Sequence, residues 1–248
     1  MGKTGVILAQ LGGPATLDEV EPFIRSIFDD PRLVPLPGGA RTRSLVSALV
    51  ARGRASRVRS HYAEIGGGSP IVSTTQRQAD ALERELISRG HDVVVAVAHR
   101  YSKPDTKAAL DKVLAANVDG IVLLPLYPQY SATTTGSSEA ELRAQLHDRN
   151  SEVPVSVVRS WTDDAGYLEL QAQLVDDMIA SIPADLDEGL LVFSAHGIPQ
   201  RLIDRGDPYF EEVESTVAGV TQRLKHRLAH RIAFQSRAGP MKWVAPDV

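Results

Sequence analysis

The segment that decides the fold is LLVFSAHGIP, residues Leu190–Pro199. Its first four residues, Leu190–Phe193, form an apolar run that is typical of a fully buried strand in a parallel sheet. A short turn that contains His196 is expected directly after this strand. Ligands of open α/β sheets bind just outside the carboxyl ends of the strands, and imidazole can exchange protons near neutral pH or bind a metal. His196 is therefore a candidate site residue, and a half-buried histidine with a structural role is the alternative.

The composition limits the class of protein. The chain has 248 residues, 43% of them hydrophobic and 23% charged, as expected for a globular protein of one large or two moderate domains. A net charge of −4 argues against a nucleic-acid-binding protein. The lack of cysteine excludes disulfides, thiolate catalysis and cysteine-ligated zinc or iron–sulfur sites. We see no secretory leader and no apolar run of the ~20 residues that span a membrane, so we expect a cytoplasmic protein.

Apolar runs alternate with amphipathic segments along the chain. The runs predicted as strands are Gly5–Leu11, Val93–Ala98, Gly120–Pro125, Val153–Val158, Leu190–Phe193 and Arg231–Phe234. The segments predicted as helices are Thr75–Arg89, Asp105–Ala116, Ser138–Asp148, Asp164–Ile182 and Phe210–Leu228. This alternation predicts an α/β fold with parallel sheets covered by helices on both faces. A domain boundary is expected between Trp161 and Tyr167.

Two glycine-rich turns could lie close to a ligand. Gly12-Gly13-Pro14 follows the first predicted strand, and Gly66–Gly68 precedes Ser69. Neither turn matches the dinucleotide fingerprint or carries the lysine of a P-loop, so a nucleotide site is not supported. We expect the second turn to form a wall beside a flat ligand, with Tyr62 and Ser69 as polar anchors. An ordinary flexible turn is the alternative.

Residues 41–60 contain six arginines and no acidic residue. Part of this segment is expected to be the solvated face of a helix. A local excess of arginine in an acidic protein also indicates an anionic ligand, because guanidinium groups bind carboxylate and phosphate in a bidentate manner. A small carboxylate fits better than a nucleic acid, because the patch is short.

Two further strand ends carry polar residues. The strand at 93–98 ends at His99-Arg100-Tyr101, and the strand at 120–125 continues into a loop rich in hydroxyl groups. We expect Tyr127 and Tyr130 of this loop to lie near a crevice. Ser137 or Ser138 is expected to cap the helix that follows.

Together these motifs resemble the ferrochelatases, which insert ferrous iron into a porphyrin in haem biosynthesis. The resemblance runs from Val6 to the last residue and rests on the order and spacing of its motifs. They are LGGP at 11–14, IGGGSPI at 65–71, RY at 100–101, PQYSATTTGSS at 128–138, SAHGIP at 194–199, GDPY at 206–209, and QSRAGP at 235–240 with Trp243.

The resemblance implies two Rossmann-like, chelatase-type domains with parallel sheets flanked by helices. The first is expected at 1–162 with the porphyrin-contacting segment, and the second at 163–248 with the pocket histidine. Relatives continue beyond the Trp243 region with a strand and helix that carry an acidic residue opposite this histidine. We therefore expect a C-terminally truncated chain with an incomplete second domain. An inactive form that only binds porphyrin or haem is the alternative to an active enzyme.

The resemblance also implies residue roles. His196 would be the pocket histidine and would either accept pyrrole protons or ligate the incoming iron. The residues implied to contact the porphyrin are Arg54, Tyr62, Ser69, Arg100, Tyr101, Tyr127, Trp243 and Leu11. Ala132 stands where some relatives have a cluster-ligating cysteine, which implies a form without an iron–sulfur cluster. Fe²⁺ would be a substrate, and no tightly bound cofactor is expected. His99 stands where relatives usually have an apolar residue.

Other classes of protein are alternatives to this one. A hydrolase using Ser194 and His196 is disfavoured, because residues two apart at a strand end rarely reach hydrogen-bond geometry and the nucleophile-elbow motif is absent. A porphyrin carrier without turnover and a chelatase for another tetrapyrrole or metal, such as cobalt, stay open. The preferred porphyrin, peripheral contact with a membrane and the oligomeric state also stay open.

Overall fold

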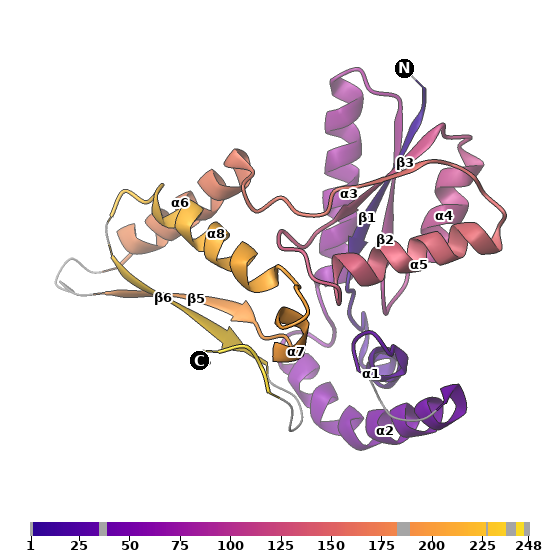
Figure 1. Ribbon diagram of the computed structural model, residues 1–248, viewed down its shortest axis with the longest axis horizontal. Coiled ribbons are helices and arrows are strands. Elements are labelled where there is room, and N and C mark those ends of the chain that lie inside the picture. The colour runs from indigo at the N-terminus through magenta and orange to yellow at the C-terminus, as the bar shows by residue number, and fades with distance from the viewer. Residues whose placement is uncertain (1, 35–38, 183–188, 227, 237–241, 246–248) are drawn as a thin grey trace. The chain divides into compact units, whose positions relative to one another are not determined.

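The computed structural model describes residues 2–34, 39–182, 189–226, 228–236 and 242–245 (Figure 1). The chain forms two compact units. Unit 1 comprises Met1–Tyr127 and Thr133–Arg159, and unit 2 comprises Pro128–Ala132 and Ser160–Val248. Each unit contains a parallel sheet with helices packed on it, which confirms the predicted mixed α/β fold.

Unit 1 is built on a four-stranded sheet in the order β2-β1-β3-β4, in which every pair of neighbours is parallel. The strands are β1 (Thr4–Gln10), β2 (Val93–His99), β3 (Gly120–Pro125) and β4 (Val155–Val157). The helices are η1 (Leu17–Glu19), α1 (Val20–Asp29), α2 (Ala40–Glu64), α3 (Ile71–Ser88), α4 (Thr106–Ala115) and α5 (Thr135–Asp148). The four strands predicted in this part of the chain are confirmed, with ends shifted by up to two residues.

Both faces of this sheet are covered. Along β1, Val6 and Leu8 belong to an apolar cluster that includes Ala79 of α3. Ile7 lies on the other face, in a second cluster with Leu110 of α4 and Leu142 of α5. Successive residues of a strand point to opposite faces, so these two clusters place α3 on one face and α4 and α5 on the other (Figure 1).

One edge of this sheet, at β2, is capped by side chains. The Val95 backbone N–H donates to Glu83 Oε1 of α3 at 2.8 Å, and Lys112 Nζ of α4 donates to the Val95 carbonyl at 2.8 Å. Unpaired edge groups are a template for pairing with another chain. Glu83 and Lys112 therefore close the edge strand at its centre.

Helices α1 and α2, here called the helical arm, pack against each other. Val20 and Ile24 of α1 form an apolar cluster with Ala51 of α2. The sequence analysis did not predict α1 and anticipated α2 only in part. Pro22 lies in the first turn of α1, where the missing N–H costs nothing. The arginines of α2 are spread around the helix, so the sequence pattern shows no clear apolar face.

Unit 2 holds a smaller sheet of two parallel strands, β5 (Leu190–His196) and β6 (Ala229–Gln235). Its helices are α6 (Ala165–Ala180), α7 (Gln200–Ile203) and α8 (Tyr209–Thr221). The prediction of a strand that ends at Phe193 is wrong, because pairing with β6 continues through His196 opposite Gln235.

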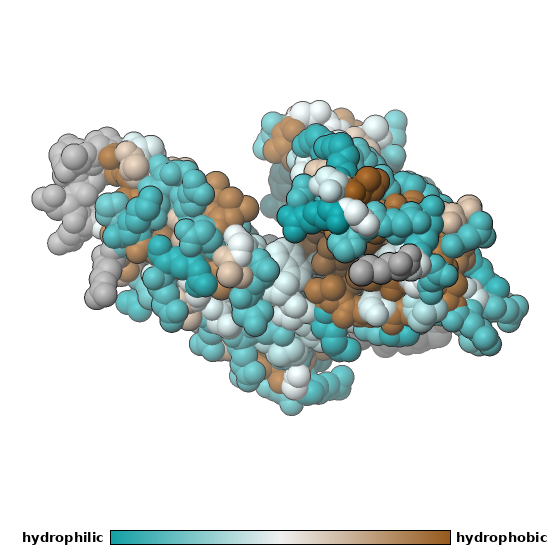
Figure 2. Space-filling model, turned by 90° about the horizontal axis from the view of Figure 1, so that it is seen from above, coloured by the Kyte–Doolittle hydropathy of each residue, from teal (hydrophilic) through white to brown (hydrophobic). Residues whose placement is uncertain are grey.

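The prediction that this strand is fully buried is also wrong. Residues of β5 alternate between exposed and half-buried positions. Phe193 packs against Leu168 of α6 and Val220 of α8, whereas Leu190 on the opposite face is 57% exposed. Helices of the described part cover one face only, so apolar residues of β5 such as Leu190 remain at the surface. Figure 2 shows the molecule from above, with hydrophobic patches in brown among hydrophilic residues in teal.

Helix α8 is shorter than predicted. Its buried positions include Val213, Val217 and Val220, as the periodicity indicates, but it ends at Thr221 instead of Leu228. The buried carboxylate of Asp176 on α6 accepts the Lys225 backbone N–H, with its two oxygens at 3.2 and 3.3 Å. This contact stabilises a non-helical path that the apolar pattern does not reveal.

In the part of the chain that the structure describes, no helix has both the length and the apolar character needed to cross a membrane.

Candidate functional site

Two segments, residues 10–13 and residues 100–102, meet at the carboxyl end of the unit 1 sheet. The Arg100 N–H donates to the Gln10 carbonyl at 2.9 Å, and the Tyr101 N–H donates to the Leu11 carbonyl at 3.1 Å. The Gly13 N–H donates to Ser102 Oγ at 3.2 Å. Three residues implied to contact porphyrin, Leu11, Arg100 and Tyr101, are thus held side by side.

The two glycine-rich turns pack against each other. The Ser69 N–H donates to the Pro14 carbonyl at 2.7 Å. A Cβ at Gly68 would lie 2.2 Å from the Ala15 carbonyl oxygen, and a Cβ at Gly13 would lie 2.7 Å from Ser69 Cβ. Side chains at these positions would break the contact, so glycine is required for close packing of the two turns. Ser69 is thereby placed beside the Leu11–Pro14 turn.

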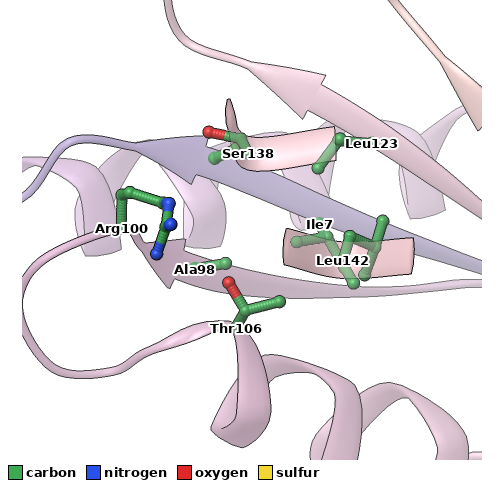
Figure 3. Close-up of a pocket in the computed structure, with 8 residues that line it drawn as sticks. Ile7, Ala98, Arg100, Thr106, Leu123, Ser138 and Leu142 are labelled. Atoms are coloured by element: carbon green, nitrogen blue, oxygen red, sulfur yellow. The ribbon is translucent and has the colours of Figure 1, made fainter. Parts of the chain in front are cut away.

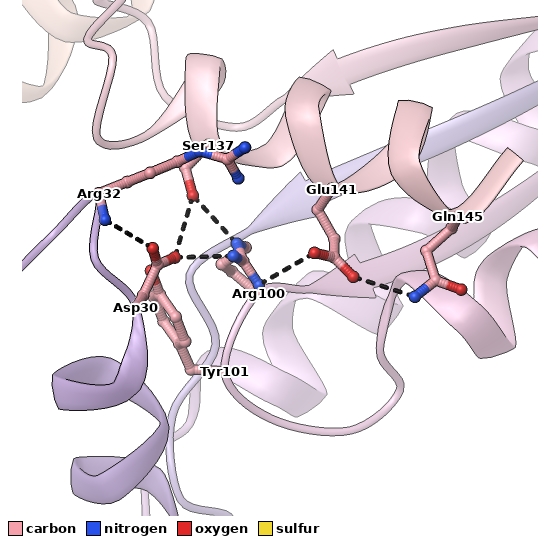
Figure 4. Close-up of polar contacts among 7 residues, drawn as sticks. All are labelled: Asp30, Arg32, Arg100, Tyr101, Ser137, Glu141 and Gln145. Atoms are coloured by element: carbon pink, nitrogen blue, oxygen red, sulfur yellow. Dashed lines mark hydrogen bonds and ion pairs between the residues drawn. The ribbon is translucent and has the colours of Figure 1, made fainter. Parts of the chain in front are cut away.

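Arg100 is the centre of a polar network (Figure 4). Its Nη2 donates to Asp30 Oδ2 at 2.7 Å, and its Nε donates to Ser137 Oγ at 3.0 Å. Its Nη1 lies 3.7 Å from Glu141 Oε2. The expectation that Ser137 or Ser138 caps α5 is wrong, because the N-cap is Thr134 and Ser137 lies in the first turn. Ser137 instead orients the guanidinium.

Two tyrosines at this end of the sheet keep their protons. The Tyr101 hydroxyl donates to Asp30 Oδ2 at 2.9 Å. Burial, and then the negative charge of Asp30, raise the pKa of Tyr101. Burial also raises the pKa of Tyr127, against the opposing effects of a hydrogen bond with Ser138 and the charge of Arg100. Both side chains therefore act as neutral hydroxyls.

A small hollow in unit 1 lies next to this network (Figure 3). Arg100, Thr106 and Ser138 supply its polar lining. The remaining lining residues are Ile7, Ala9, Ala98, Leu123 and Leu142. The hollow has no enclosed space for even a water molecule, whereas common ligand pockets measure roughly 300–1,000 Å³. We assign no porphyrin site to this hollow.

Arg54 and Tyr62 lie on α2 of the helical arm. Arg54 is exposed, with its guanidinium carbon 5.6 Å from the ring centroid of Phe28. Tyr62 is half-buried against the arm's apolar cluster, and burial raises its pKa. Arg54 therefore offers an accessible positive charge, whereas Tyr62 anchors the end of α2.

In unit 2, His196 is the last residue of β5 and lies on its open face. The side chain is accessible, yet neighbouring atoms desolvate the imidazole and lower its pKa below the ordinary value. A lowered pKa keeps the imidazole neutral at neutral pH. The neutral form can accept a proton or bind a metal ion.

Trp243 lies next to the residues that follow His196. The Gly197 N–H donates to the Gln235 carbonyl at 2.7 Å, and Trp243 forms an isolated antiparallel bridge with Pro199. A Cβ at Gly197 would lie 3.5 Å from Trp243 Cε3. Unit 2 thus brings together the two of its residues that the resemblance implies for the site.

The sequence analysis missed three acidic residues with organising roles. In unit 2, Glu212 Oε2 accepts from the Tyr130 N–H at 2.7 Å, and Asp207 Oδ2 accepts from the Ala132 N–H at 2.8 Å. In unit 1, Asp30 holds Arg100. Asp207 stands in the quoted GDPY motif, but its spacing alone indicated no partner. Asp30 and Glu212 carried no sequence signal.

Among the described residues, no group of three or more His, Asp or Glu side chains could hold a metal ion. The role of His196 as an iron contact stays a prediction from the resemblance.

The fold and these residues define an α/β protein whose polar side chains gather at the carboxyl ends of parallel strands, with a neutral histidine at one of them. Comparison with known proteins makes this class specific. The Ferrochelatase family model matches residues 3–248, and the chain belongs to the ferrochelatase family.

Individual relatives agree. The chain is similar to the ferrochelatase of Synechocystis sp., with 38% identity over 249 residues that cover 99% of this chain and 64% of the relative. Ferrochelatase-2, chloroplastic, of Cucumis sativus is 38% identical over 251 residues, which cover 98% of this chain and 49% of the relative. The chain therefore spans less than two thirds of the length of these curated relatives.

Proposed function

We propose that this protein inserts ferrous iron into a porphyrin to form haem. The observation that carries the proposal is the match to the ferrochelatase family, which extends through both units from residue 3 to residue 248. The site residues add support, because each unit places polar groups at the carboxyl end of its parallel strands.

His196 is the proposed reactive group. Insertion of Fe²⁺ replaces two pyrrole N–H protons, which must leave the macrocycle. A neutral imidazole can accept one of these protons at a ring nitrogen, or it can donate a lone pair to the incoming iron. The lowered pKa of His196 supports either role, because it favours the neutral ring.

The proposed porphyrin contacts follow the chemistry of the ligand, a flat apolar ring with carboxylates at its rim. Arg54 is exposed and suits a propionate, whereas Leu11 and Trp243 suit the ring. The other proposed contacts are Tyr62, Ser69, Arg100, Tyr101 and Tyr127. For Arg100, whose guanidinium is held by Asp30, we propose a place in the wall of the pocket.

We further infer that the protein works in the cytoplasm, without an iron–sulfur cluster or a tightly bound cofactor. The absence of cysteine from all 248 residues, including position 132, supports the absence of a cluster. Cell fractionation and the iron content of the purified protein test these two points.

An anaerobic assay tests the function. The chain is mixed with Fe²⁺ and a free-acid porphyrin, and haem formation is followed by absorbance beside a protein-free control. Insertion above the control rate supports the enzyme, and its loss in His196→Ala with porphyrin binding retained supports the role of the histidine. Ser194→Ala, on the same face of β5, is the matched control and should keep full activity.

Two other outcomes would contradict the proposal for this chain. Porphyrin or haem binding without turnover would favour the carrier that only binds tetrapyrroles. A lack of both binding and turnover would remove the assignment to porphyrin chemistry.

A further inference from the structure

The helical arm has an apolar core of its own. The close packing partners of α1 and α2 are each other and η1. Their cluster is formed by Val20, Ile24 and Ala51, with Phe28, Val58 and Tyr62 beside it. None of these residues belongs to the two clusters described for the faces of the unit 1 sheet. Apolar packing thus holds the arm together more than it holds the arm to the sheet.

Polar contacts also close the arm on itself. Ser47 Oγ of α2 donates to Asp29 Oδ1 of α1, and Arg25 Nη2 donates to Ser44 Oγ at 3.1 Å. Arg59 Nε donates to the Leu17 carbonyl at 3.1 Å. Because α1 and α2 are bonded at several points, the arm should move as one body.

One buried carboxylate ties the far end of α1 to the sheet. Asp30 follows α1 directly and is 6% exposed. Its Oδ2 accepts from Arg100 at 2.7 Å and from the Tyr101 hydroxyl at 2.9 Å, and lies 3.4 Å from Ser137 Oγ (Figure 4). Arg100 and Tyr101 follow β2, and Ser137 lies in the first turn of α5, so Asp30 joins the arm to two elements of the sheet layer.

The charge of Asp30 matters as much as its shape. A buried carboxylate is stable only when opposite charge and hydrogen bonds compensate its desolvation. Arg100 supplies that charge, and the Arg32 N–H satisfies Oδ1 at 2.8 Å. Removal of the carboxylate would leave Arg100, which is only 17% exposed, with Glu141 as its remaining acidic neighbour at 3.7 Å.

The start of the arm has a separate attachment. The turn before η1 is fixed by the bond from the Ser69 N–H to the Pro14 carbonyl. With the contacts of Asp30, this bond holds α1 near both of its ends, so loss of the Asp30 contacts should leave the arm freer to move.

We propose that Asp30 is a positioning residue that fixes the helical arm against the carboxyl end of the unit 1 sheet. By fixing the arm, it sets the place of Arg54 and Tyr62 on α2. The second statement, on the placing of Arg54 and Tyr62, rests on the proposed function, because it concerns porphyrin binding. The first statement, that Asp30 fixes the arm, concerns unit 1 alone.

Spin-label distances test the first statement. The chain has no cysteine, so Ser56→Cys on α2 and Gln78→Cys on α3, both exposed, give two unique labelling sites. We expect one narrow distance distribution in the parent chain and a clearly broader one in Asp30→Ala. Asp29→Ala is the matched control, because Asp29 bonds only within the arm in the contacts described, and it should keep the narrow distribution.

Asp30→Asn covers the case in which Asp30→Ala does not fold. The amide keeps the shape but loses the charge, so the distribution should broaden by less than in the alanine variant. A parent-like distribution in every folded Asp30 variant would overturn the proposal. Equal broadening in Asp29→Ala would also overturn the proposal, because the effect would then not be specific to the contacts of Asp30 with the sheet layer.

Porphyrin affinity, measured by fluorescence quenching, tests the second statement. Asp30→Ala should weaken binding of a free-acid porphyrin about tenfold. Arg54→Ala should cost much less affinity in the Asp30→Ala background than in the parent. In that background the displaced Arg54 would already have lost most of its interaction with the porphyrin. Additive losses would refute positioning of Arg54 through Asp30. If the parent chain binds no porphyrin, the proposed function fails, while the distance measurement still decides the role of Asp30.

Discussion

At the scale of single residues, His99 is a buried base at the end of a strand. It ends β2, is 1% exposed, and its Nδ1 lies 3.2 Å from the Lys103 carbonyl oxygen. Within the described residues, its Nε2 has no hydrogen-bond partner. Burial lowers the pKa of His99, and the hydrogen bond with Lys103 opposes this only in part. The folded state therefore holds His99 as a neutral side chain.

This burial predicts a loss of stability in mild acid. Below about pH 6.5 the unfolded chain binds a proton at His99, whereas the folded chain does not until the pH reaches the lower folded pKa. The free energy of unfolding should fall across that window, and His99→Leu should make the fall shallower. Urea unfolding from pH 7.5 to 5 measures the slope. His147→Gln, at an exposed position, is the control and should keep the parent slope.

Arg54 allows a second prediction at this scale. If it pairs with a propionate, Arg54→Ala should weaken porphyrin binding by about 1.5–3 kcal/mol, the range for a hydrogen bond to a charged group. A porphyrin ester should be bound equally by parent and variant. Arg52→Ala, also exposed on α2, is the control. Equal affinity of the parent for ester and free acid would argue against the pairing.

At the scale of elements, the edge of β2 depends on two side chains from different helices. Glu83→Ala should leave the buried Val95 N–H without its acceptor and cost about 1–3 kcal/mol. The variant should also aggregate faster, because the edge is open to another chain. Chemical unfolding and light scattering measure the two effects. Glu85→Ala removes only an exposed ion pair with Arg89, and little change is expected there.

Periodicity in the sequence revealed the elements but not the contacts between them. The apolar run around Val6–Leu8 predicted β1 correctly, because both of its faces are buried in unit 1. The same kind of run at Leu190–Phe193 gave the right strand but the wrong burial, because a run of apolar residues does not say how many faces are covered. Helix α1 was not predicted because its segment contains Pro22, although the first turn of a helix tolerates proline.

The candidate site was predictable only where a motif marked it. His196 stood out because its strand was recognisable, and Arg100 because it followed another. Asp30 gave no signal, because its partners lie about 70 and 107 positions away and no local pattern encodes such a distance. Long-range polar contacts of this kind need the three-dimensional fold.

At the scale of the whole molecule, the two units have separate apolar cores. Leu110 belongs to a cluster of unit 1, and Val217 is buried in unit 2. The sheet of unit 1 is covered on both faces, whereas in the described part of unit 2 helices cover one face of the two-stranded sheet. Less apolar area buried for each strand means less stabilisation of its backbone hydrogen bonds.

The units should therefore open with different free energies. Hydrogen exchange should protect the amides of β1 longest and those of β5 for a shorter time, because local opening of β5 exposes less buried apolar surface. Leu110→Ala, a core truncation that costs about 2–5 kcal/mol, should accelerate exchange in unit 1 and leave β5 and β6 nearly unchanged. Val217→Ala should do the reverse. If either substitution accelerates exchange equally in both units, their cores are coupled and the chain unfolds as a single cooperative body.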